Sequence, residues 1–265
     1  MRNKDIWKIA MEQSAIDLNC SVNDFMNKGN TVVISKLNEG RKKCYKKPMF
    51  CGLAYYGDGL VASVDEKIKD FIEKFIARHS EYRCFDTPQL IALNREFEKH
   101  DKCVCFIAEF FLPDLEKKVL INDKLEVKIF SEDEIPSLYK DDRFHMALGY
   151  SSESDKKDVL SAVGYIDGKI AGVAGASNDC DTMWQIGIDV LPEYRRLGVA
   201  STLTKILTDE IIKRGKVPFY CTAWSNIASK NNAIKCGYKT AWVEMTAINT
   251  IDAMKMIGES VIYSE

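Results

Sequence analysis

The stretch WQIGIDVLPEYRRLGVASTLTKILTDEIIKRG, residues 184–215, decides how this chain folds. It begins with an apolar run and passes through Pro192 into a basic turn that contains a glycine. After the turn, apolar residues recur at spacings of three and four, which is typical of an amphipathic helix, and Gly215 suits the C-terminal end of that helix. The sequence therefore predicts a strand, a tight loop and a helix in immediate succession.

The first turn of this helix is a candidate anion-binding site. Its backbone N–H groups have no acceptor within the helix, and the aligned peptide dipoles add partial positive charge there. Gly198 and Ala200 are small, so the oxygens of a ligand can approach the main chain closely. We therefore expect the loop to hold a phosphate or a pyrophosphate.

Two motifs in this region resemble those of the GNAT superfamily of N-acetyltransferases. Arg195, Gly198 and Ala200 form an R-x-x-G-x-A pattern that is similar to the superfamily's acyl-CoA signature. Residues 224–229, followed by the Cys-Gly-Tyr of residues 236–238, resemble its next strand-helix unit. The resemblance implies that acetyl-CoA is the cosubstrate and that its acetyl group passes to a primary amine. A small-molecule amine is favoured over a protein terminus, because a large extra domain can wall off the pocket.

The resemblance also implies which main-chain groups hold the cofactor. The backbone of Ile188 and Val190 pairs with the pantetheine arm as a further strand would, and an N–H group near them faces the thioester carbonyl. The N–H groups of residues 196–200 hold the pyrophosphate. These roles follow from the family and not from the spacing of the residues.

Some side chains in the same motifs have two possible roles. Arg195 and Arg196 add charge beside the phosphates, or one of them is a solvated surface arginine. Ser201 donates to a phosphate or fills the first helical turn. In the family, Asn226 contacts the pantetheine or a water beside it, and asparagine is also a frequent N-cap. The expected cofactor-binding set is Ile188, Val190, Arg195, Arg196, Leu197, Gly198, Val199, Ala200, Ser201 and Asn226.

The residues that usually perform acid and base chemistry in the superfamily are absent. Ala233 stands where many members place a tyrosine that protonates the leaving thiolate, and Trp184 and Ile186 stand where a glutamate base often lies. The transfer can instead depend on proximity and a water relay, since a thiol with a pKa near 8.5 is a tolerable leaving group. The catalytic residues are therefore left unassigned.

Several carboxylates near the motifs are candidates for a base. Asp189 lies within the predicted strand, but the two-residue alternation points it away from the face of Ile188 and Val190, so we expect a structural contact. The remaining candidates are Asp179, Asp181 and Glu244, of which Asp181 and Glu244 are the ones we retain.

Two tryptophans flank the cofactor motifs. Trp184 and Trp224 each precede one of the two motifs, and both are expected substrate-binding residues that line an acceptor pocket. Burial in the core is the commoner fate of a tryptophan. Cys221 has no histidine nearby in sequence, so a small buried side chain explains it better than a nucleophile does.

Composition bounds the class of protein. The chain has 265 residues, a net charge of −2 and nine cysteines without a C-x-x-C pair. The near-neutral charge argues against nucleic-acid binding, and the cysteines fit reduced thiols in the cytoplasm. Its three histidines are isolated in sequence, so no metal site is expected. No apolar stretch is long enough for a membrane span, and the N-terminus suits an amphipathic helix better than a signal peptide. A homodimer is compatible with these features.

The length suggests two domains, with a boundary near residue 124. Residues 1–124 are expected to form a mixed α/β domain with strands at 31–34, 50–56 and 104–111. Helices are predicted up to residue 19, from a capping box of Ser63 and Glu66 to about His79, and from Pro88 to about Lys99. The segment YYGDGLVAS, residues 55–63, faintly resembles the later phosphate loop, as a degenerate copy of the same fold would. A hairpin turn followed by a helix cap is the simpler interpretation.

Residues 125–265 are expected to form the acetyltransferase domain. Strands are predicted at 125–130, 159–166, 169–176, 183–190, 218–223 and 240–248, and helices at 131–139, 142–148, 199–213 and 226–236. Asp167-Gly168 between two apolar runs favours a type I′ hairpin, and residues 151–157 are expected to form a mobile loop. The fold class is therefore α/β, with a GNAT-like mixed and mainly antiparallel sheet flanked by helices.

A binding protein without catalysis is the alternative function. Such a module would retain acyl-CoA as a sensor or a structural ligand, and the absent tyrosine and glutamate favour it. The phosphate loop suits both interpretations equally. A helix-groove interaction protein would leave the small residues at 198 and 200 unexplained.

Overall fold

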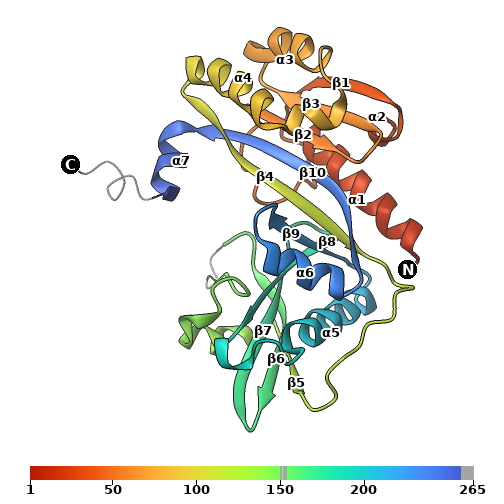
Figure 1. The fold of residues 1–265 in the computed structure, drawn as a ribbon, viewed down its shortest axis with the longest axis vertical. Helices are drawn as coiled ribbons and strands as arrows, with labels where there is room; N and C mark the ends of the chain where they lie inside the picture. Colours follow the sequence, from red (N-terminus) through yellow and green to blue (C-terminus); the bar gives the residue numbers. More distant parts are fainter. Residues whose placement is uncertain (150, 152–153, 258–265) are drawn as a thin grey trace, which may run out of the picture. The chain divides into compact units, whose positions relative to one another are not determined.

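The computed structural model describes residues 1–149, 151 and 154–257, which divide into two compact units (Figure 1). The first unit contains Met1–Gln13, Lys42–Cys44 and Phe110–Ala241. The second contains Ser14–Arg41, Tyr45–Glu109 and the chain from Trp242 onward. This division does not coincide with the predicted boundary near residue 124. Strands pair with neighbours that are distant in sequence, so continuity of the chain does not decide which unit a segment joins.

The sheet of the first unit contains strands in the order β9-β8-β7-β6-β5. All neighbours are antiparallel except β8 and β9, which are parallel. Asp167 and Gly168 have φ values of 50° and 74° between β6 and β7, which confirms the predicted type I′ hairpin. The strands are β5 (Glu126–Ser131), β6 (Asp158–Ile166), β7 (Lys169–Ser177), β8 (Met183–Val190) and β9 (Val217–Ala223).

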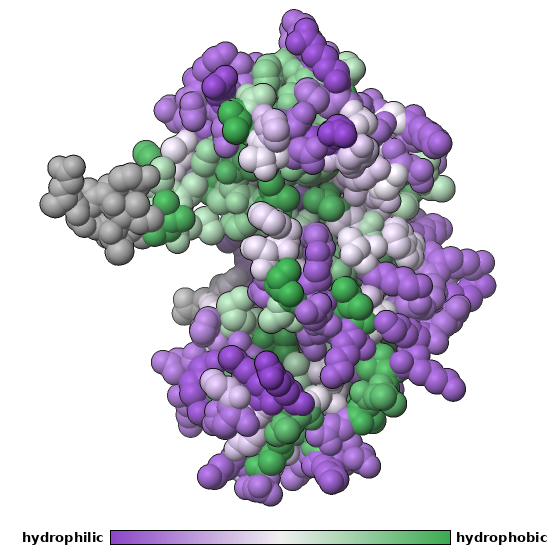
Figure 2. Space-filling model, in the orientation of Figure 1, coloured by the Kyte–Doolittle hydropathy of each residue, from purple (hydrophilic) through white to green (hydrophobic). Residues whose placement is uncertain are grey.

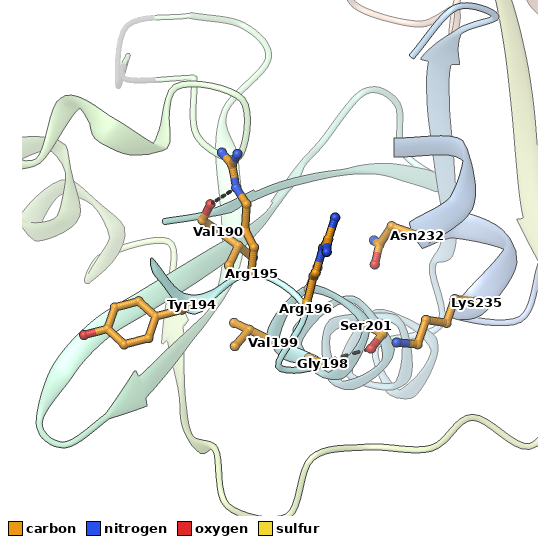
Figure 3. A pocket seen from close by; sticks show the side chains of 10 residues that line it. Val190, Tyr194, Arg195, Arg196, Gly198, Val199, Ser201, Asn232 and Lys235 are labelled. Atoms are coloured by element: carbon orange, nitrogen blue, oxygen red, sulfur yellow. Dashed lines mark hydrogen bonds between the residues drawn. The ribbon is translucent and has the colours of Figure 1, made fainter. Parts of the chain in front are cut away.

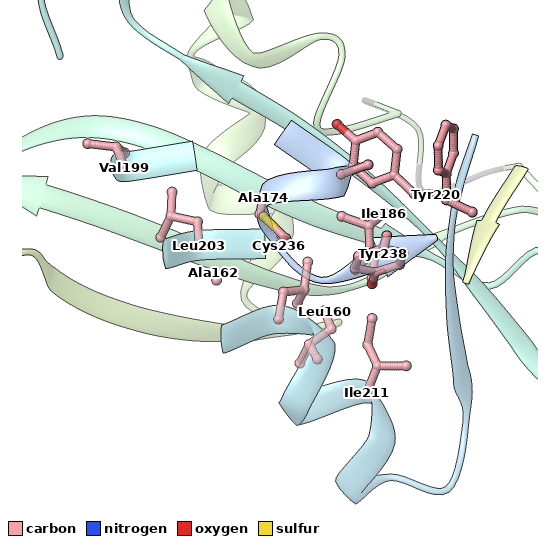
Figure 4. Packing of buried hydrophobic residues seen from close by; sticks show 14 of the residues in the cluster. Leu160, Ala162, Ala174, Ile186, Val199, Leu203, Ile211, Tyr220, Cys236 and Tyr238 are labelled. Atoms are coloured by element: carbon pink, nitrogen blue, oxygen red, sulfur yellow. The ribbon is translucent and has the colours of Figure 1, made fainter. Parts of the chain in front are cut away.

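Helix α5 (Val199–Lys213) covers one face of this sheet (Figure 4). Its buried Leu203, Leu207 and Ile211 lie one turn apart and pack in one cluster with alternate residues of β6, β7 and β8. The other face of β6 and β7 carries a second cluster, which includes Phe144 and Leu148. Helix α6 (Ile227–Lys235) follows β9. The predicted mixed sheet flanked by helices is confirmed.

The two helices predicted at residues 131–139 and 142–148 are wrong. The structure has short 3₁₀ helices there, η4 (Ile135–Lys140) and η5 (Asp142–Phe144). The carboxylate of Glu134 accepts hydrogen bonds from the backbone N–H of Ser131 at 2.8 Å and from its hydroxyl at 2.6 Å, so residues 131–134 form a local turn in place of the first helical turn. The predicted mobile loop at 151–157 lies partly outside the described residues.

The second unit has its own α/β core. Strand β1 (Gly29–Ile34) is parallel to β3 (Gly59–Val64), and β2 (Cys51–Tyr55) is antiparallel to both β3 and β10. Helices α3 and α4 pack their buried residues in one cluster with these strands. Helices α2 (Val22–Met26), α3 (Lys69–Ile76) and α4 (Thr87–Phe97) also belong to this unit. Helix α1 (Asn3–Leu18) and strands β4 (Lys102–Pro113) and β10 (Tyr238–Asn249) each have residues in both units.

The predicted capping box at Ser63 and Glu66 is also wrong. Ser63 lies within β3, where it pairs with Gly52 and Val33, so its backbone already has strand partners. Asp65 caps instead, because its carboxylate accepts from the N–H of Lys67 at 2.9 Å. The glycines of YYGDGLVAS connect β2 and β3 as an antiparallel hairpin, which confirms the hairpin turn of the simpler interpretation but not the helix cap at Ser63.

Helix α7 (Thr250–Ile257) was not expected from the sequence. Its exposed apolar residues are Ile251, Met256 and Ile257, and Figure 2 shows apolar surface over this helix. Within the described residues, none of the helices combines the length and the apolar character that a bilayer crossing requires.

Candidate active site

Strand β8 loses one of its two neighbours along its length. It pairs with β7 as far as Val190, which lies opposite Gly172, but its pairing with β9 ends at Ile186, opposite Tyr220. Among the described residues, no strand pairs with the β9-facing edge of β8 from Gly187 onward. Such an edge presents backbone donors and acceptors to an extended ligand.

The loop after β8 presents a row of backbone N–H groups. Arg196 and Gly198 have positive φ values of 63° and 78°, and Gly198 is the N-cap residue of α5, with no side chain to cap it. The first N–H group at this helix start that finds an acceptor is that of Thr202, which donates to the carbonyl of Gly198 at 3.0 Å. Within the described part of the chain, the N–H groups of residues 196–201 have no acceptor. They are available to an anion.

These N–H groups belong to a pocket between the loop and α6 (Figure 3). Figure 3 shows Arg196 from the loop and Asn232 and Lys235 from α6 around the same space. The described residues that line it include no carboxylate, and Arg195, Arg196 and Lys235 form no ion pair with any described residue. The lining is Val190, Tyr194, Arg195, Arg196, Gly198, Val199, Ala200, Ser201, Asn232 and Lys235.

A second pocket, with a volume of about 350 Å³, opens on β7 and β8 where they carry Gly175, Ser177, Gln185 and Gly187. These β8 residues alternate with Ile186, which packs in the cluster under α5, so this pocket lies on the opposite face of the strand. The remaining lining comes from residues 145–149 and from Ser151, Ser154, Lys156 and Asp158.

The segment over this second face is held against β8. The carboxylate of Asp189 accepts hydrogen bonds from the N–H groups of Met146 at 2.7 Å and Ala147 at 2.9 Å. Gly187 is needed there, because a Cβ at this position would lie 2.2 Å from the carbonyl oxygen of Met146. The expectation that Asp189 makes a structural contact is confirmed.

A comparison with protein families identifies the domain that carries both pockets. Residues 125–238 match the model of the acetyltransferase (GNAT) family. These residues form a GNAT acetyltransferase domain. The family is consistent with acyl transfer. No curated protein gives a significant match.

Solved structures of GNAT proteins resemble the chain at low sequence identity. A putative GNAT acetyltransferase from Novosphingobium aromaticivorans is 18% identical, with a TM-score of 0.40, over 56% of this chain and 66% of that one. A GNAT acetyltransferase from Colwellia psychrerythraea is 13% identical, with a TM-score of 0.41, over 56% of this chain and 57% of that one. This chain thus spans less than two thirds of both. The aminoglycoside N-acetyltransferase AAC(6')-Iy, in complex with CoA, is 21% identical, with a TM-score of 0.35, over 44% of this chain and 92% of that one.

Seven of the residues expected to bind the cofactor line the first pocket of the GNAT domain, and three do not. Ile188 packs against the cluster under α5, and Leu197 is 52% exposed, with its carbonyl accepting from the amide of Asn122 at 2.9 Å. Asn226 caps α6, because its side chain accepts from the N–H of Ser229 at 3.1 Å.

Tyr194, Asn232 and Lys235 line the first pocket but were not predicted from the sequence. The two α6 residues are three apart and therefore lie on one face of the helix. Their spacing would have grouped them, but only the packing of α6 beside α5 directs that face to the loop.

The tyrosine and glutamate that many GNAT proteins use have no substitute at the same positions. Ala233 is fully buried, and Ile186 is a core residue. Tyr220 is also buried, which raises the pKa of its phenol, and its hydroxyl contacts that of Ser229 at 3.0 Å. It therefore stays protonated at neutral pH.

The retained base candidates lie outside the linings of both pockets. Asp181 is exposed, and its carbonyl oxygen accepts from the ammonium of Lys216 at 2.6 Å. Glu244 is buried in the second unit, where its carboxylate accepts from the hydroxyl of Tyr45 at 3.0 Å and the indole of Trp242 at 2.7 Å.

The two tryptophans expected at the acceptor pocket also lie outside both linings. Trp184 packs against the cluster under α5, whereas Trp224 is 66% exposed. The core role therefore describes Trp184 better than a pocket role does.

Proposed function

We propose that the GNAT domain is an N-acetyltransferase that passes the acetyl group of acetyl-CoA to a primary amine of a small molecule. The observation that carries this proposal is the convergence of acceptor-free N–H groups at residues 196–201 and three cationic side chains on one pocket. A diphosphate needs this combination of directed donors and positive charge.

The parts of the cofactor can be assigned to elements of the chain. The diphosphate is held by the N–H groups of the loop and by Arg196 and Lys235. The pantetheine arm extends along the edge of β8 from Val190 toward Gly187, where β9 has separated. Arg195 donates to the carbonyl of Val190 at 3.1 Å, so this side chain must share or release that oxygen when the arm pairs with the strand.

The acceptor amine enters from the second pocket, on the other face of β8. Its lining supplies hydroxyls and an amide from Ser151, Ser154, Ser177 and Gln185. Lys156 there is paired with Asp179 at 2.8 Å, and the carboxylate of Asp158 accepts from Tyr139 and Gly149. The pocket therefore suits a polar primary amine.

The chemistry requires the two pockets to meet at the edge of β8. The amine nitrogen attacks the thioester carbonyl, the C–N bond forms and the C–S bond breaks. A backbone N–H of the edge stabilises the oxyanion, the thiolate leaves, and one proton departs from the nitrogen.

The proposal that the first pocket binds the cofactor is tested by measuring CoA binding. CoA should raise the melting temperature in a concentration-dependent way, because it binds only the folded state. Replacement of Lys235 by Ala should weaken CoA binding about tenfold, which corresponds to about 1.4 kcal/mol. Lys230→Ala, on the same helix but outside the pocket lining, is the control. No change of melting temperature with CoA would contradict the proposal.

A silent acyl-CoA module remains the second candidate, because buried Ala233 replaces the usual acid. Release of the CoA thiol from acetyl-CoA, measured with a panel of polar primary amines, separates the two functions. The enzyme releases thiol in proportion to acetylated amine. The sensor binds CoA with the same stabilisation and releases none above the rate of spontaneous hydrolysis.

A further inference from the structure

His145 occupies a fixed position at the rim of the second pocket. The preceding Phe144 is buried in the core cluster of that face, and the following Met146 and Ala147 are held by the carboxylate of Asp189. The backbone on both sides of His145 is therefore anchored to the sheet. Its own side chain is exposed and lines the pocket.

The anchor places this segment beside the point where β8 opens. Met146 packs its carbonyl against Gly187, the first residue of β8 beyond the last pair with β9. Gly187 has no side chain that could separate the segment from the strand. A group that reaches into the pocket from residue 145 is therefore beside the edge at which the thioester is expected.

Lys156 and Asp158, the other titratable side chains among the described residues of the pocket lining, are already engaged. The carboxylate of Asp158 is 7% exposed and accepts from the hydroxyl of Tyr139 at 2.9 Å and the N–H of Gly149 at 2.7 Å. Lys156 is paired with Asp179 and contacts Gln185 at 3.3 Å. Among the described residues, the imidazole of His145 has no hydrogen-bond or ion-pair partner.

We propose that His145 is a catalytic residue that accepts the proton of the acceptor amine. The inference rests on the proposed acetyl transfer and deepens it. The ammonium form of the amine gives one proton to the imidazole, and the neutral nitrogen then attacks the thioester as the C–S bond breaks. The nitrogen loses its second proton as the amide forms, and this proton converts the departing thiolate into the CoA thiol. The imidazolium returns its proton to solvent through the open pocket. Histidine is the side chain that most often transfers protons in steps of this kind.

The pH dependence of the transfer is the first test. His145→Gln should lower kcat/KM about 10²- to 10⁴-fold at pH 7 and remove the acidic limb of its pH profile, while the affinity for CoA stays within twofold. Added imidazole should partly restore the rate of His145→Ala. The charged groups on the surrounding elements, which can also shape the profile, are Asp142, Arg143, Lys156, Asp158, Asp189 and Glu193.

Two variants serve as controls. His100→Gln removes a histidine of the second unit, and Asp181→Asn removes the exposed carboxylate retained from the sequence. Both should keep the acidic limb and a kcat/KM within threefold of the wild type. The inference is overturned if His145→Gln keeps the limb and the rate, or if Asp181→Asn loses them instead.

A spectroscopic readout separates failure of this inference from failure of the proposed function. The chain has three histidines, so ¹³C-labelled histidine gives three ring signals, and His145→Gln identifies one of them. With CoA bound, 2-aminoethanol, glucosamine or spermidine should shift the signal of His145 and leave the other two unchanged. A shift without thiol release supports the placement of His145 and rejects the acetyl transfer. No shift with any amine that is acetylated rejects His145.

Discussion

Gly198 combines an unusual backbone conformation with a position at the candidate phosphate site. Its φ of 78° is one that residues with a side chain rarely adopt, and the nearest atom to an added Cβ is 3.7 Å away. A methyl group therefore fits the space, and its cost comes from the backbone. The same strain would misdirect the N–H groups on either side.

We expect Gly198→Ala to lower the free energy of unfolding by about 1 kcal/mol and to weaken CoA binding at least tenfold. Gly215→Ala is the matched control at the other end of α5, because its φ is 74° and nothing lies within 4 Å of an added Cβ. Urea denaturation and calorimetric CoA titration measure the two effects. Equal CoA affinity in both variants would exclude residue 198 from the phosphate site.

A substitution at Arg196 should weaken CoA binding and leave the stability of the fold almost unchanged. It has a φ of 63° without being a glycine, so Arg196→Gly relieves backbone strain and should not lower the free energy of unfolding by more than about 0.5 kcal/mol. The same change removes a cation from the pocket, and CoA binding should weaken and become less dependent on salt. Titrations at low and high salt check this. An unchanged salt dependence would mean that Arg196 is only a solvated residue.

At the scale of elements, helix α6 begins at the N-cap residue Asn226. The sequence left two roles open for Asn226, which were capping the helix and contacting the cofactor. The side chain of Asn226 accepts from the N–H of Ser229, and Asn226 does not line the first pocket. Asn226→Ala should lower the free energy of unfolding by about 1 kcal/mol, whereas Asn226→Asp retains a capping acceptor. Thermal unfolding and CoA titration measure both. Weaker CoA binding in both variants at unchanged stability would restore the cofactor role.

The strand-loop-helix unit could be predicted because each of its parts is specified locally. The apolar run, the glycine at a positive φ and the three-and-four spacing of α5 all act within a few residues. The helices that were predicted wrongly lie in segments with competing local preferences. At Ser131, for example, a turn held by side-chain hydrogen bonds replaces the start of the expected helix. Residues of α6 that complete the pocket were missed, because helix packing brings them to the loop.

At the scale of the molecule, the division into units predicts how fragments behave. A fragment of residues 125–265 lacks Met1–Gln13, Lys42–Cys44 and residues 110–124 of its own unit. We expect it to show a broad, non-cooperative melting curve, since buried residues such as Phe111 would be absent from its core. Circular dichroism of the fragment and the full chain checks this. A cooperative transition of the fragment that CoA stabilises would support the boundary predicted from the sequence.

The reactivity of the nine cysteines is a second test of the whole fold. Burial raises the pKa of Cys84 and Cys236 to about 11, which lowers their reactive thiolate fraction at pH 8. With a thiol reagent in excess, exposed Cys44 should react first, and the buried Cys51, Cys84, Cys180 and Cys236 only after unfolding. Absorbance and mass spectrometry count and locate the modified residues. Rapid modification of the four buried thiols would contradict the core described above.

The sequence by itself determined the order of strands and helices around residues 184–215, the family resemblance and the glycine-containing loop that presents N–H groups. These features depend on residues near one another in the chain, so local spacing is enough to specify them. Only the tertiary structure decided that α6 supplies Asn232 and Lys235, that β9 leaves β8 after Ile186, and that Asp189 holds the segment of His145. Those contacts join residues that are distant in sequence, and packing of the whole unit is what brings them together.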